Sequence, residues 1–375
     1  MDGFDQLAMN WRSALLGLII VCSAAALVSL IRRGIERRAA LWFAMFVLSG
    51  GVSVIPMVIG FAGAYDIWPG LTFLPTQMAL FFGPAIALHA RELILGPQPR
   101  RALWLFAPGL AYWLYQLWAF TMLGDYRAKW AFTAAYHDPF IYPIAMTIAF
   151  VLTALCLAHV ARLQGLYINW LRDNHSDDDE FSPSWLTHLT IFSALVTVVW
   201  GFEFILARWF GHSYAQVFVW DFVALFAVFV ISLEALAGID REFPKMEEPA
   251  TPEIDDTAEK PERDWAVEGA RLEAEVLERN WHLEPGLSLQ TLARRFGTNH
   301  AYLSRAINQG LGKNFSSFIN GLRVEHAKGL IMRGEMTMID IAMETGFGSK
   351  ASFNRAFKIH AGINPSEFGR RCKAI

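Results

Sequence analysis

Residues 304–318 read SRAINQGLGKNFSSF and residues 354–368 read NRAFKIHAGINPSEF, two stretches that share one pattern 50 residues apart. Six positions are identical, and they form the pairs Arg305/Arg355, Ala306/Ala356, Gly312/Gly362, Asn314/Asn364, Ser316/Ser366 and Phe318/Phe368. Upstream, Ala293 matches Ala342 and Gly297 matches Gly346 at an offset of 49 residues. Chance supplies one or two such pairs but not this set, so the sequence indicates a duplicated structural unit.

Each copy has the pattern of a helix-turn-helix. The first copy predicts a helix with an apolar stripe, then a tight turn at Gly297, where positive φ is tolerated, and a second helix that starts at Asn299. Gly346 takes the turn position in the second copy, and Ser349 is the expected N-cap of its second helix. The expected core residues are Leu289, Leu292, Ala293, Phe296, Leu303 and Ile307 in the first copy, and Ile339, Ile341, Ala342, Phe353, Ala356 and Phe357 in the second.

The charge of the chain is unevenly distributed. The whole chain carries a net charge of −3, whereas residues 285–375 contain 13 Lys and Arg against 5 Asp and Glu, a net charge of +8. A basic surface attracts nucleic-acid phosphates in a salt-dependent manner. A run of charge by itself is more typical of a solvated face, but a repeated helix-turn-helix pattern together with this charge predicts binding to double-stranded DNA.

The repeat region resembles the AraC/XylS family of transcription regulators over roughly residues 265–371, which is under a third of the chain. The matching motifs are AMETGF at 342–347, SFNRAFK at 352–358 and GINPSEF at 362–368. FINGLRVEHAK at 318–328 looks like the family's helix that joins two subdomains. The resemblance implies seven helices in two helix-turn-helix units. Each unit has one recognition helix, and the two recognition helices enter successive major grooves of the DNA.

Carried onto this chain, the resemblance places the recognition helices at about 299–309 and 350–359. The residues expected to face DNA are His300, Tyr302, Arg305 and Asn308 in the first helix, and Lys350, Ser352, Asn354, Arg355 and Lys358 in the second. Arg, Asn and Lys can read base edges in the major groove, although some of these residues should contact phosphates only. The paired Arg305 and Arg355 either contact DNA or hold their own subdomains together.

Residues 1–239 have a different character, with long uncharged runs that suit a lipid environment. A span needs ~20 mostly apolar residues. We predict seven spans, at residues 12–31, 40–63, 71–92, 103–123, 140–162, 185–206 and 215–237. The fold class is therefore all-α: a polytopic membrane bundle followed by a soluble double helix-turn-helix domain. Many members of the AraC/XylS family carry a soluble cupin-like sensor domain instead of a membrane bundle. The resemblance therefore implies nothing about the ligand, or about whether the protein activates or represses transcription.

The distribution of Lys and Arg predicts the orientation of the spans. With the N-terminus outside, the inner connections hold nine basic residues, namely Arg32, Arg33, Arg37, Arg38, Arg91, Arg100, Arg101, Arg162 and Arg172. The outer side then holds four, namely Arg12, Arg127, Lys129 and Arg208. An odd number of spans puts the C-terminal domain in the cytoplasm, where DNA is, so we expect a multi-pass protein of the cytoplasmic (inner) membrane.

Two acidic residues, Glu203 and Asp221, fall inside the sixth and seventh predicted spans. Ionisable residues within a membrane are costly, which makes them candidates for a functional site. The pair is a candidate site for a cationic ligand, a proton or coupling between spans. The alternative is that these acids pair with Arg208 or meet interfacial water.

The sequence predicts three regions: a seven-helix transmembrane domain at 1–239 that we expect to act as a sensor, a disordered acidic linker at 240–264, and an AraC-type helix-turn-helix DNA-binding domain at 265–375. Ten acids, four bases and four prolines occupy the 25 linker residues, a composition typical of a disordered tether. Cys22, Cys156 and Cys372 show no metal-ligand spacing, and no catalytic motif or phosphate loop occurs. We therefore expect no enzyme, no cofactor and no metal.

These features predict a one-component regulator that couples a small-molecule or membrane signal to transcription. DNA and the lipid bilayer are its expected partners, with a second copy of the chain and RNA polymerase as further candidates. One alternative is a transporter or membrane enzyme with a regulatory DNA-binding tail. Another is a soluble regulator that is released by cleavage in the linker.

Overall fold

The computed structural model describes residues 10–32, 37–178, 181–182, 184–210, 214–237, 243–246 and 264–373. Every regular element within these ranges is a helix, which confirms the all-α prediction. The chain divides into two compact units. One unit, the bundle, comprises Met1–Gln164 and Pro183–Lys245, and the other, the C-terminal unit, comprises Gly165–Ser182 and Met246–Ile375. Most of the predicted linker lies outside the described residues.

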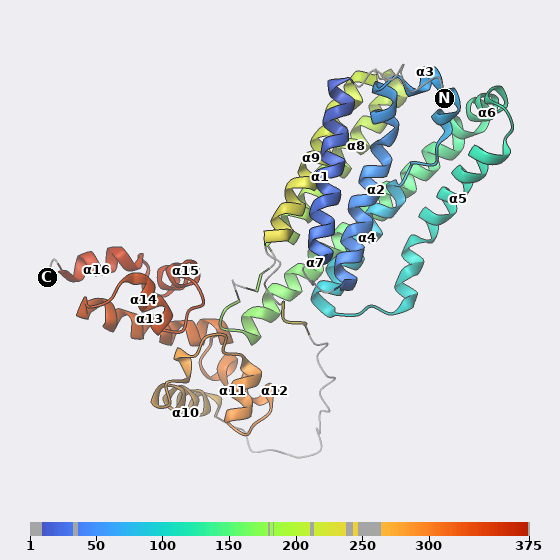
Figure 1. Ribbon diagram of the computed structural model, residues 1–375. Helices are drawn as coiled ribbons and strands as arrows, with labels where there is room; N and C mark the ends of the chain where they lie inside the picture. Colours follow the sequence, from blue (N-terminus) through green and yellow to red (C-terminus); the bar gives the residue numbers. More distant parts are fainter. Residues whose placement is uncertain are drawn as a thin grey trace, which may run out of the picture. The chain divides into compact units, whose positions relative to one another are not determined.

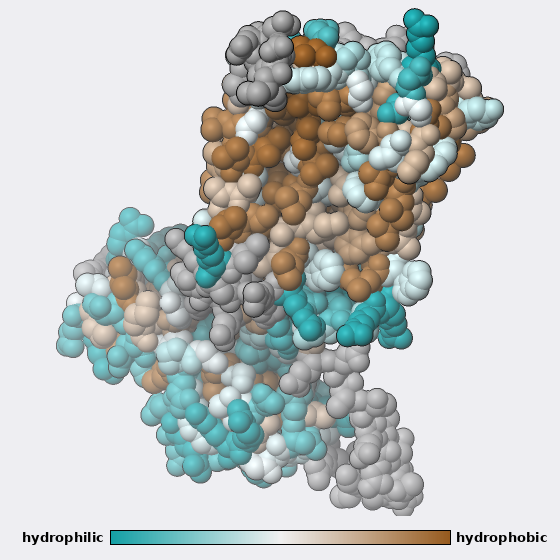
Figure 2. Space-filling view, turned by 45° about the vertical axis from the view of Figure 1, so that its right-hand side comes forward, coloured by the Kyte–Doolittle hydropathy of each residue, from teal (hydrophilic) through white to brown (hydrophobic). Residues whose placement is uncertain are grey.

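The bundle consists of long helices that lie alongside one another (Figure 1). They are α1 (Trp11–Arg32), α2 (Arg37–Phe61), α4 (Ala79–Leu95), α5 (Ala107–Met122), α7 (Tyr142–Asn174), α8 (Ser184–Phe210) and α9 (Tyr214–Ala237). The last part of α7, from Gly165 on, belongs to the C-terminal unit. Shorter elements connect them: α3 (Ala64–Ile67), η2 (Pro69–Phe73), η3 (Arg100–Phe106), α6 (Tyr126–Phe132) and the π-helical η4 (Thr133–Ile141). Figure 2 shows apolar side chains over much of the visible face of this unit.

Four segments of the described residues are long and apolar enough to cross a membrane. They are Trp11–Ser29, Arg38–Phe61, Tyr126–Asn174 and Ser184–Leu206. The predicted number of seven spans is therefore not confirmed. The predicted spans 71–92 and 103–123 each begin in a 3-10 helix or loop, so their α-helices α4 and α5 have only 17 and 16 residues, fewer than the ~20 that a perpendicular span needs.

The C-terminal unit contains seven α-helices in residues 264–373, the number that the family resemblance implies. They are α10 (Trp265–Glu278), α11 (Leu289–Arg295), α12 (His300–Arg305), α13 (Phe315–Arg333), α14 (Met338–Glu344), α15 (Lys350–Ala361) and α16 (Pro365–Lys373). The 3-10 helix η5 (Trp281–Leu283) follows α10, and the π-helical η6 (Ala306–Gly310) extends α12.

Helix α13 joins two separate hydrophobic cores. Phe318, Ile319 and Leu322 belong to the first core, which α10, α11 and α12 complete. Val324, Ala327 and Ile331 belong to the second core, which α14 and α15 complete. The predicted core residues are buried, with Phe296 partly so, except Ile339, which is 51% exposed. Met338 packs against the second core in its place, because the helix begins one residue before Ile339 and turns that side chain outward.

Side-chain caps fix where these helices start. Asn299 Oδ1 accepts the backbone N–H of Tyr302, and Ser349 Oγ accepts that of Ser352, as the sequence predicts. Ser288, Asn314 and Thr337 cap α11, α13 and α14 in the same way. Because each cap satisfies a donor that the helix leaves unpaired, short helices such as α11 and α12 gain defined first turns.

The two turn glycines should differ in their tolerance of alanine. Gly297 and Gly346 both have positive φ, 59° and 82°, but a Cβ on Gly297 would meet nothing within 4 Å. A Cβ on Gly346 would overlap the carbonyl oxygen of Leu283. We expect Gly297→Ala to cost about 1 kcal/mol for the left-handed backbone, and Gly346→Ala to cost about 1–3 kcal/mol more because backbone must move. Hydrogen exchange of the α13 amides measures the loss of stability in each variant. Equal losses of stability in the two variants would contradict the packing argument.

Candidate nucleic-acid interface

The first predicted recognition helix is α12 together with η6. Arg305 and Asn308 are exposed on it, as expected of residues that face DNA. Tyr302 is half-buried, and its hydroxyl donates to Glu268 Oε2 at 2.6 Å, so it braces α12 against α10. His300 is exposed and lies 2.6 Å, Nε2 to Oδ1, from Asn174 at the end of α7. Two of the four predicted residues thus make contacts within the protein that the helical pattern did not suggest.

The second predicted recognition helix is α15, on which Lys350, Asn354, Arg355 and Lys358 are exposed together. Ser352 does not face away from the core. It is buried, and its hydroxyl donates to the carbonyl oxygen of Ser349 at 2.8 Å. The reason is the helical register, since Ser352 and Phe353 precede Ala356 and Phe357 by one turn and share their buried stripe. Its role is to complete the cap of α15.

Helix α16 adds residues to the candidate DNA-binding surface that were not predicted from the sequence. Asn354 of α15 lines a small hollow of about 310 Å³ with Ser366, Glu367 and Arg370 of α16. Arg370 is exposed beside a predicted DNA-contacting residue and is therefore a candidate phosphate contact. Its signal in the sequence was only the general basic charge of the C-terminal region.

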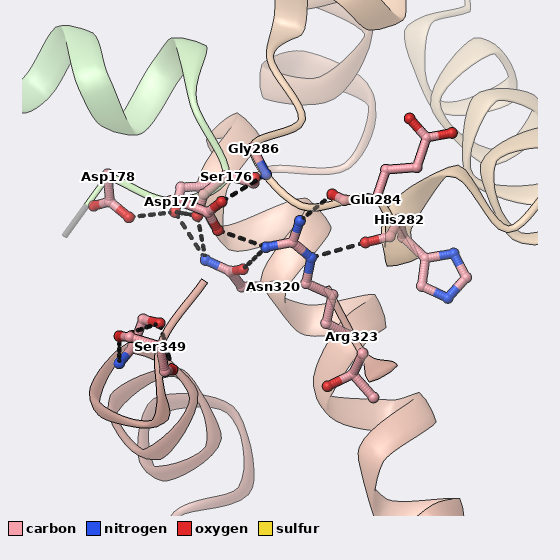
Figure 3. Close-up of polar contacts among 12 residues, drawn as sticks. Ser176, Asp177, Asp178, His282, Glu284, Gly286, Asn320, Arg323 and Ser349 are labelled. Atoms are coloured by element: carbon pink, nitrogen blue, oxygen red, sulfur yellow. Dashed lines mark hydrogen bonds and ion pairs between the residues drawn. The ribbon is translucent and has the colours of Figure 1, made fainter. Parts of the chain in front are cut away.

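Arg323 of α13 is the centre of a buried polar cluster (Figure 3). The side chain is 0% exposed. Its guanidinium donates to Asp177 Oδ1 at 2.7 Å, to the carbonyl oxygens of Glu284 at 2.6 Å and His282 at 2.8 Å, and to Asn320 Oδ1 at 3.3 Å. Burial lowers the pKa of Arg323 from its ordinary value, and the carboxylate of Asp177 opposes that change. A buried charge with this many acceptors is held in one place.

Asp177 belongs to a short segment, residues 174–178, that we call the docking segment. Its contacts reach α13 and the turn before α11. Ser176 N donates to Leu287 O at 3.0 Å, and Asp177 Oδ2 accepts the N–H of Gly286 at 2.8 Å. On α13, Ser316 Oγ donates to Asp178 Oδ1 at 2.8 Å, and Asn320 Nδ2 donates to Ser176 O at 2.8 Å. The segment that follows α7 along the chain is thus built into the C-terminal unit.

No role for Asp177 was predicted from the sequence, and Arg323 was included only within the joining-helix motif at 318–328. The ion pair links positions 146 residues apart. Neither a local helical period nor a charge count can indicate such a pair. An Arg within the apolar repeat of α13 was the one available signal, because a buried Arg requires a partner.

The predicted membrane pair, Glu203 and Asp221, lies in the bundle. Both residues line one cavity of about 590 Å³, and their charges are close enough to interact. Asp138 of η4 lines the same cavity, which the sequence did not predict. The side chain of Arg208, the alternative partner, lies outside the described side chains. We call this space the bundle cavity.

Comparison with known proteins concerns the C-terminal domain alone. Residues 292–371 match a family described as a helix-turn-helix domain. An uncharacterized HTH-type transcriptional regulator of Staphylococcus aureus (strain MSSA476) is 37% identical over 87 residues, which are 23% of this chain and 12% of that protein. The uncharacterized transcriptional regulatory protein YesN of Bacillus subtilis (strain 168) is 37% identical over 90 residues, 23% of this chain and 24% of that protein.

Among solved structures, the C-terminal domain of AraT, a response regulator from Geobacillus stearothermophilus, is 26% identical and covers 29% of this chain and 88% of that chain, with a TM-score of 0.26. The chain spans only an eighth to a quarter of the length of the two curated relatives. The motifs, the seven helices and the matched family agree on one domain. The C-terminal part of this chain is an AraC-type helix-turn-helix domain of the kind found in transcription regulators.

Proposed function

We propose that this protein is a membrane-held transcription regulator, a one-component sensor that converts a signal at its bundle into a change in DNA binding. The observation that carries the proposal is the docking segment. It lies in the chain between α7 and α8, both of which contribute candidate membrane spans, and it makes a buried ion pair with the helix that joins the two helix-turn-helix subdomains. These contacts support a route by which a signal at the membrane would reach the DNA-binding helices within one polypeptide.

The proposed DNA contacts are the exposed polar residues of the two recognition helices. Lys350, Asn354, Arg355 and Lys358 on α15 and Arg305 and Asn308 on α12 and η6 are all exposed. Arg and Lys can make hydrogen bonds to guanine, and Asn can do so to adenine, in the major groove. We assign base reading to Arg355 and Asn354, and phosphate contacts to Lys358 and Arg370. His300 contributes to DNA binding only when its hydrogen bond with Asn174 is broken.

Membrane anchoring is supported by the apolar residues on the outside of the bundle. Leu155, Val198 and Phe202 are 65%, 70% and 62% exposed, and similar side chains occur along α7 and α8. Water-exposed apolar surface on this scale is unfavourable for a soluble monomer, whereas lipid would cover it at no cost. The excess of Arg in the predicted inner connections supports an outside N-terminus and a cytoplasmic DNA-binding domain.

We further propose how the signal passes. A displacement of the end of α7 would pull on Asp177, and therefore on Arg323 and α13. Since α13 contributes to both cores, the relative placement of the two recognition helices would change. Pairing of two chains in the membrane would add to this effect by raising the local concentration of DNA-binding domains. RNA polymerase is the natural next partner of a DNA-bound regulator.

Reporter fusions test the membrane part of the proposal. Alkaline phosphatase, which is active only outside the cytoplasm, should be inactive when it is fused after residue 375 and active when fused within the predicted outer connection near Gly124. A fluorescent protein after residue 375 should remain with the membrane fraction. Fluorescence in the soluble fraction, with a shortened band in induced cells, would support release by cleavage instead.

A further inference from the structure

We infer that the bundle cavity binds an organic cation with an apolar body, such as an amphipathic amine or quaternary ammonium compound. This inference deepens the proposed function and depends on it only for the consequence of binding, namely a signal to the DNA-binding domain. The binding itself is a property of the bundle and can be tested separately.

The size of the bundle cavity fits a small ligand. Its volume of about 590 Å³ lies in the range of ~300–1,000 Å³ that is typical of small-molecule sites. Helices α2, α4, α7, α8 and α9 and the π-helical η4 all contribute to its wall. A pocket built from several bundle helices is a common position for ligand sites and would sense changes in helix packing.

The charge of the wall selects a cation. Asp138, Glu203 and Asp221 line the bundle cavity, and the described residues that line it include no Lys, Arg or His. A cavity whose wall carries side chains of one charge sign, in surroundings of low dielectric, concentrates the electric field of those charges. The three carboxylates therefore favour a cationic group in the bundle cavity over a neutral or anionic one.

Glu203 and Asp221 lie toward one end of the bundle cavity. His188 Nδ1, near the start of α8, lies 2.9 Å from Glu234 Oε1, near the end of α9. Glu203, in the second half of α8, and Asp221, in the first half of α9, line the same cavity, so α8 and α9 run antiparallel. At 1.5 Å per residue, Ser193 and Glu203 are separated by about 15 Å along α8. Between them, Val196, Thr197 and Trp200 of α8 line the cavity, and two of these three side chains are apolar or aromatic. This arrangement matches a ligand with a charged end and a long apolar body.

Two further features favour an organic cation over a metal ion. Trp200, Tyr142 and Phe204 line the bundle cavity near the acids and can contact an ammonium group through their ring faces. Ser193, only 7% exposed, also lines it, and within the described residues its Oγ has no hydrogen-bond partner. An unsatisfied buried hydroxyl is costly, so Ser193 is positioned to bond a polar atom in the body of the ligand.

Equilibrium binding of tritiated decyltrimethylammonium to the full-length protein in lipid nanodiscs tests the inference, with binding to empty nanodiscs subtracted. We expect saturable binding to the wild type. Glu203→Gln and Asp221→Asn should each weaken it by about tenfold or more, since each removes a buried charge partner. Ser193→Ala should weaken binding only of analogues that carry a hydroxyl or amide in the chain.

Glu234→Gln is the matched control, because Glu234 is an acid of α9 that pairs with His188 and does not line the bundle cavity. It should bind decyltrimethylammonium as the wild type does. Decanol and decanoate, which share the chain but lack the cation, should compete at least about tenfold less well. Equal competition by the three compounds, or equal binding by all the variants, would overturn the inference. Loss of DNA binding with intact probe binding would count against the proposed function alone.

Discussion

Lys350→Ala combined with Arg355→Ala should lower the affinity of the protein for its specific DNA sites by about two to four orders of magnitude. Both side chains are exposed on α15, the second recognition helix. A good bidentate contact to a base is worth about 1–3 kcal/mol of discrimination. Losing one such contact and one phosphate contact removes affinity and sequence preference together, which fluorescence anisotropy with specific and random duplexes measures.

The control for this prediction removes equal charge elsewhere on the same domain. Arg271 lies on α10 and Arg279 directly follows it, and they pair with Glu268 and Glu275 of α10 at 3.8 and 3.2 Å. Replacing both by alanine should change non-specific affinity and its salt dependence slightly and leave the ratio of specific to random binding intact. If both double variants lose the same affinity, α15 does not read DNA.

Asp177→Ala should destabilise the C-terminal unit by about 3–5 kcal/mol, because it leaves the guanidinium of Arg323 buried without its carboxylate. The two side chains are 0% and 3% exposed and 2.7 Å apart. The expected result is a loss of hydrogen-exchange protection in α13 and in both cores that it joins, measured on the full-length protein in nanodiscs. Because α13 holds both subdomains, specific DNA binding should fall as well.

The matched control is Glu325→Ala, which removes another acid that pairs with a base of α13. Glu325 pairs with Lys328 at 2.6 Å but is 67% exposed, so its loss should cost no more than about 1 kcal/mol. The double variant Asp177→Ala, Arg323→Met should recover much of the lost protection, since a buried ion pair replaced by apolar groups is often neutral. Equal protection in Asp177→Ala and the wild type would show that the docking segment does not hold the C-terminal unit.

The helix-turn-helix units could be read from the sequence because their signals are local. Caps such as Asn299 and Ser349, turn glycines and the spacing of Leu303 and Ile307 all act within one or two helical turns. The prediction that Ser352 faces DNA was wrong, because a serine hydroxyl can serve either in a helix cap or in a DNA contact. Only the helical register decides between these two roles. The assignment of DNA contacts to individual residues stays a prediction.

The membrane half was less predictable, because apolar composition does not show where a helix begins. Residues 71–78 carry no charge and were predicted to belong to a span, yet they comprise the end of η2 and an irregular stretch, so α4 starts only at Ala79. Elsewhere the helix is longer than predicted: it continues from Tyr126 through η4 to Asn174, well past both ends of the predicted span 140–162. The number of crossings therefore depends on helix ends and tilt, which hydropathy does not encode.

The contacts that join distant parts of the chain could not be predicted from the sequence. Asp177 had no predicted role, and its partner Arg323 appeared only within the joining-helix motif. The bundle cavity was anticipated in part, since Glu203 and Asp221 were paired by their predicted depth in neighbouring spans. Asp138 and Ser193 were not, because their approach depends on how η4 and α8 pack.

Genome-wide crosslinking of the tagged full-length protein to DNA, carried out on isolated membranes, tests the central claim most directly. The account predicts sharp peaks that remain with the membrane fraction, share a sequence and disappear in the Lys350→Ala, Arg355→Ala variant. Diffuse crosslinking that this variant does not alter, or peaks found only with a soluble fragment, would contradict a regulator that reads specific DNA sites from the membrane.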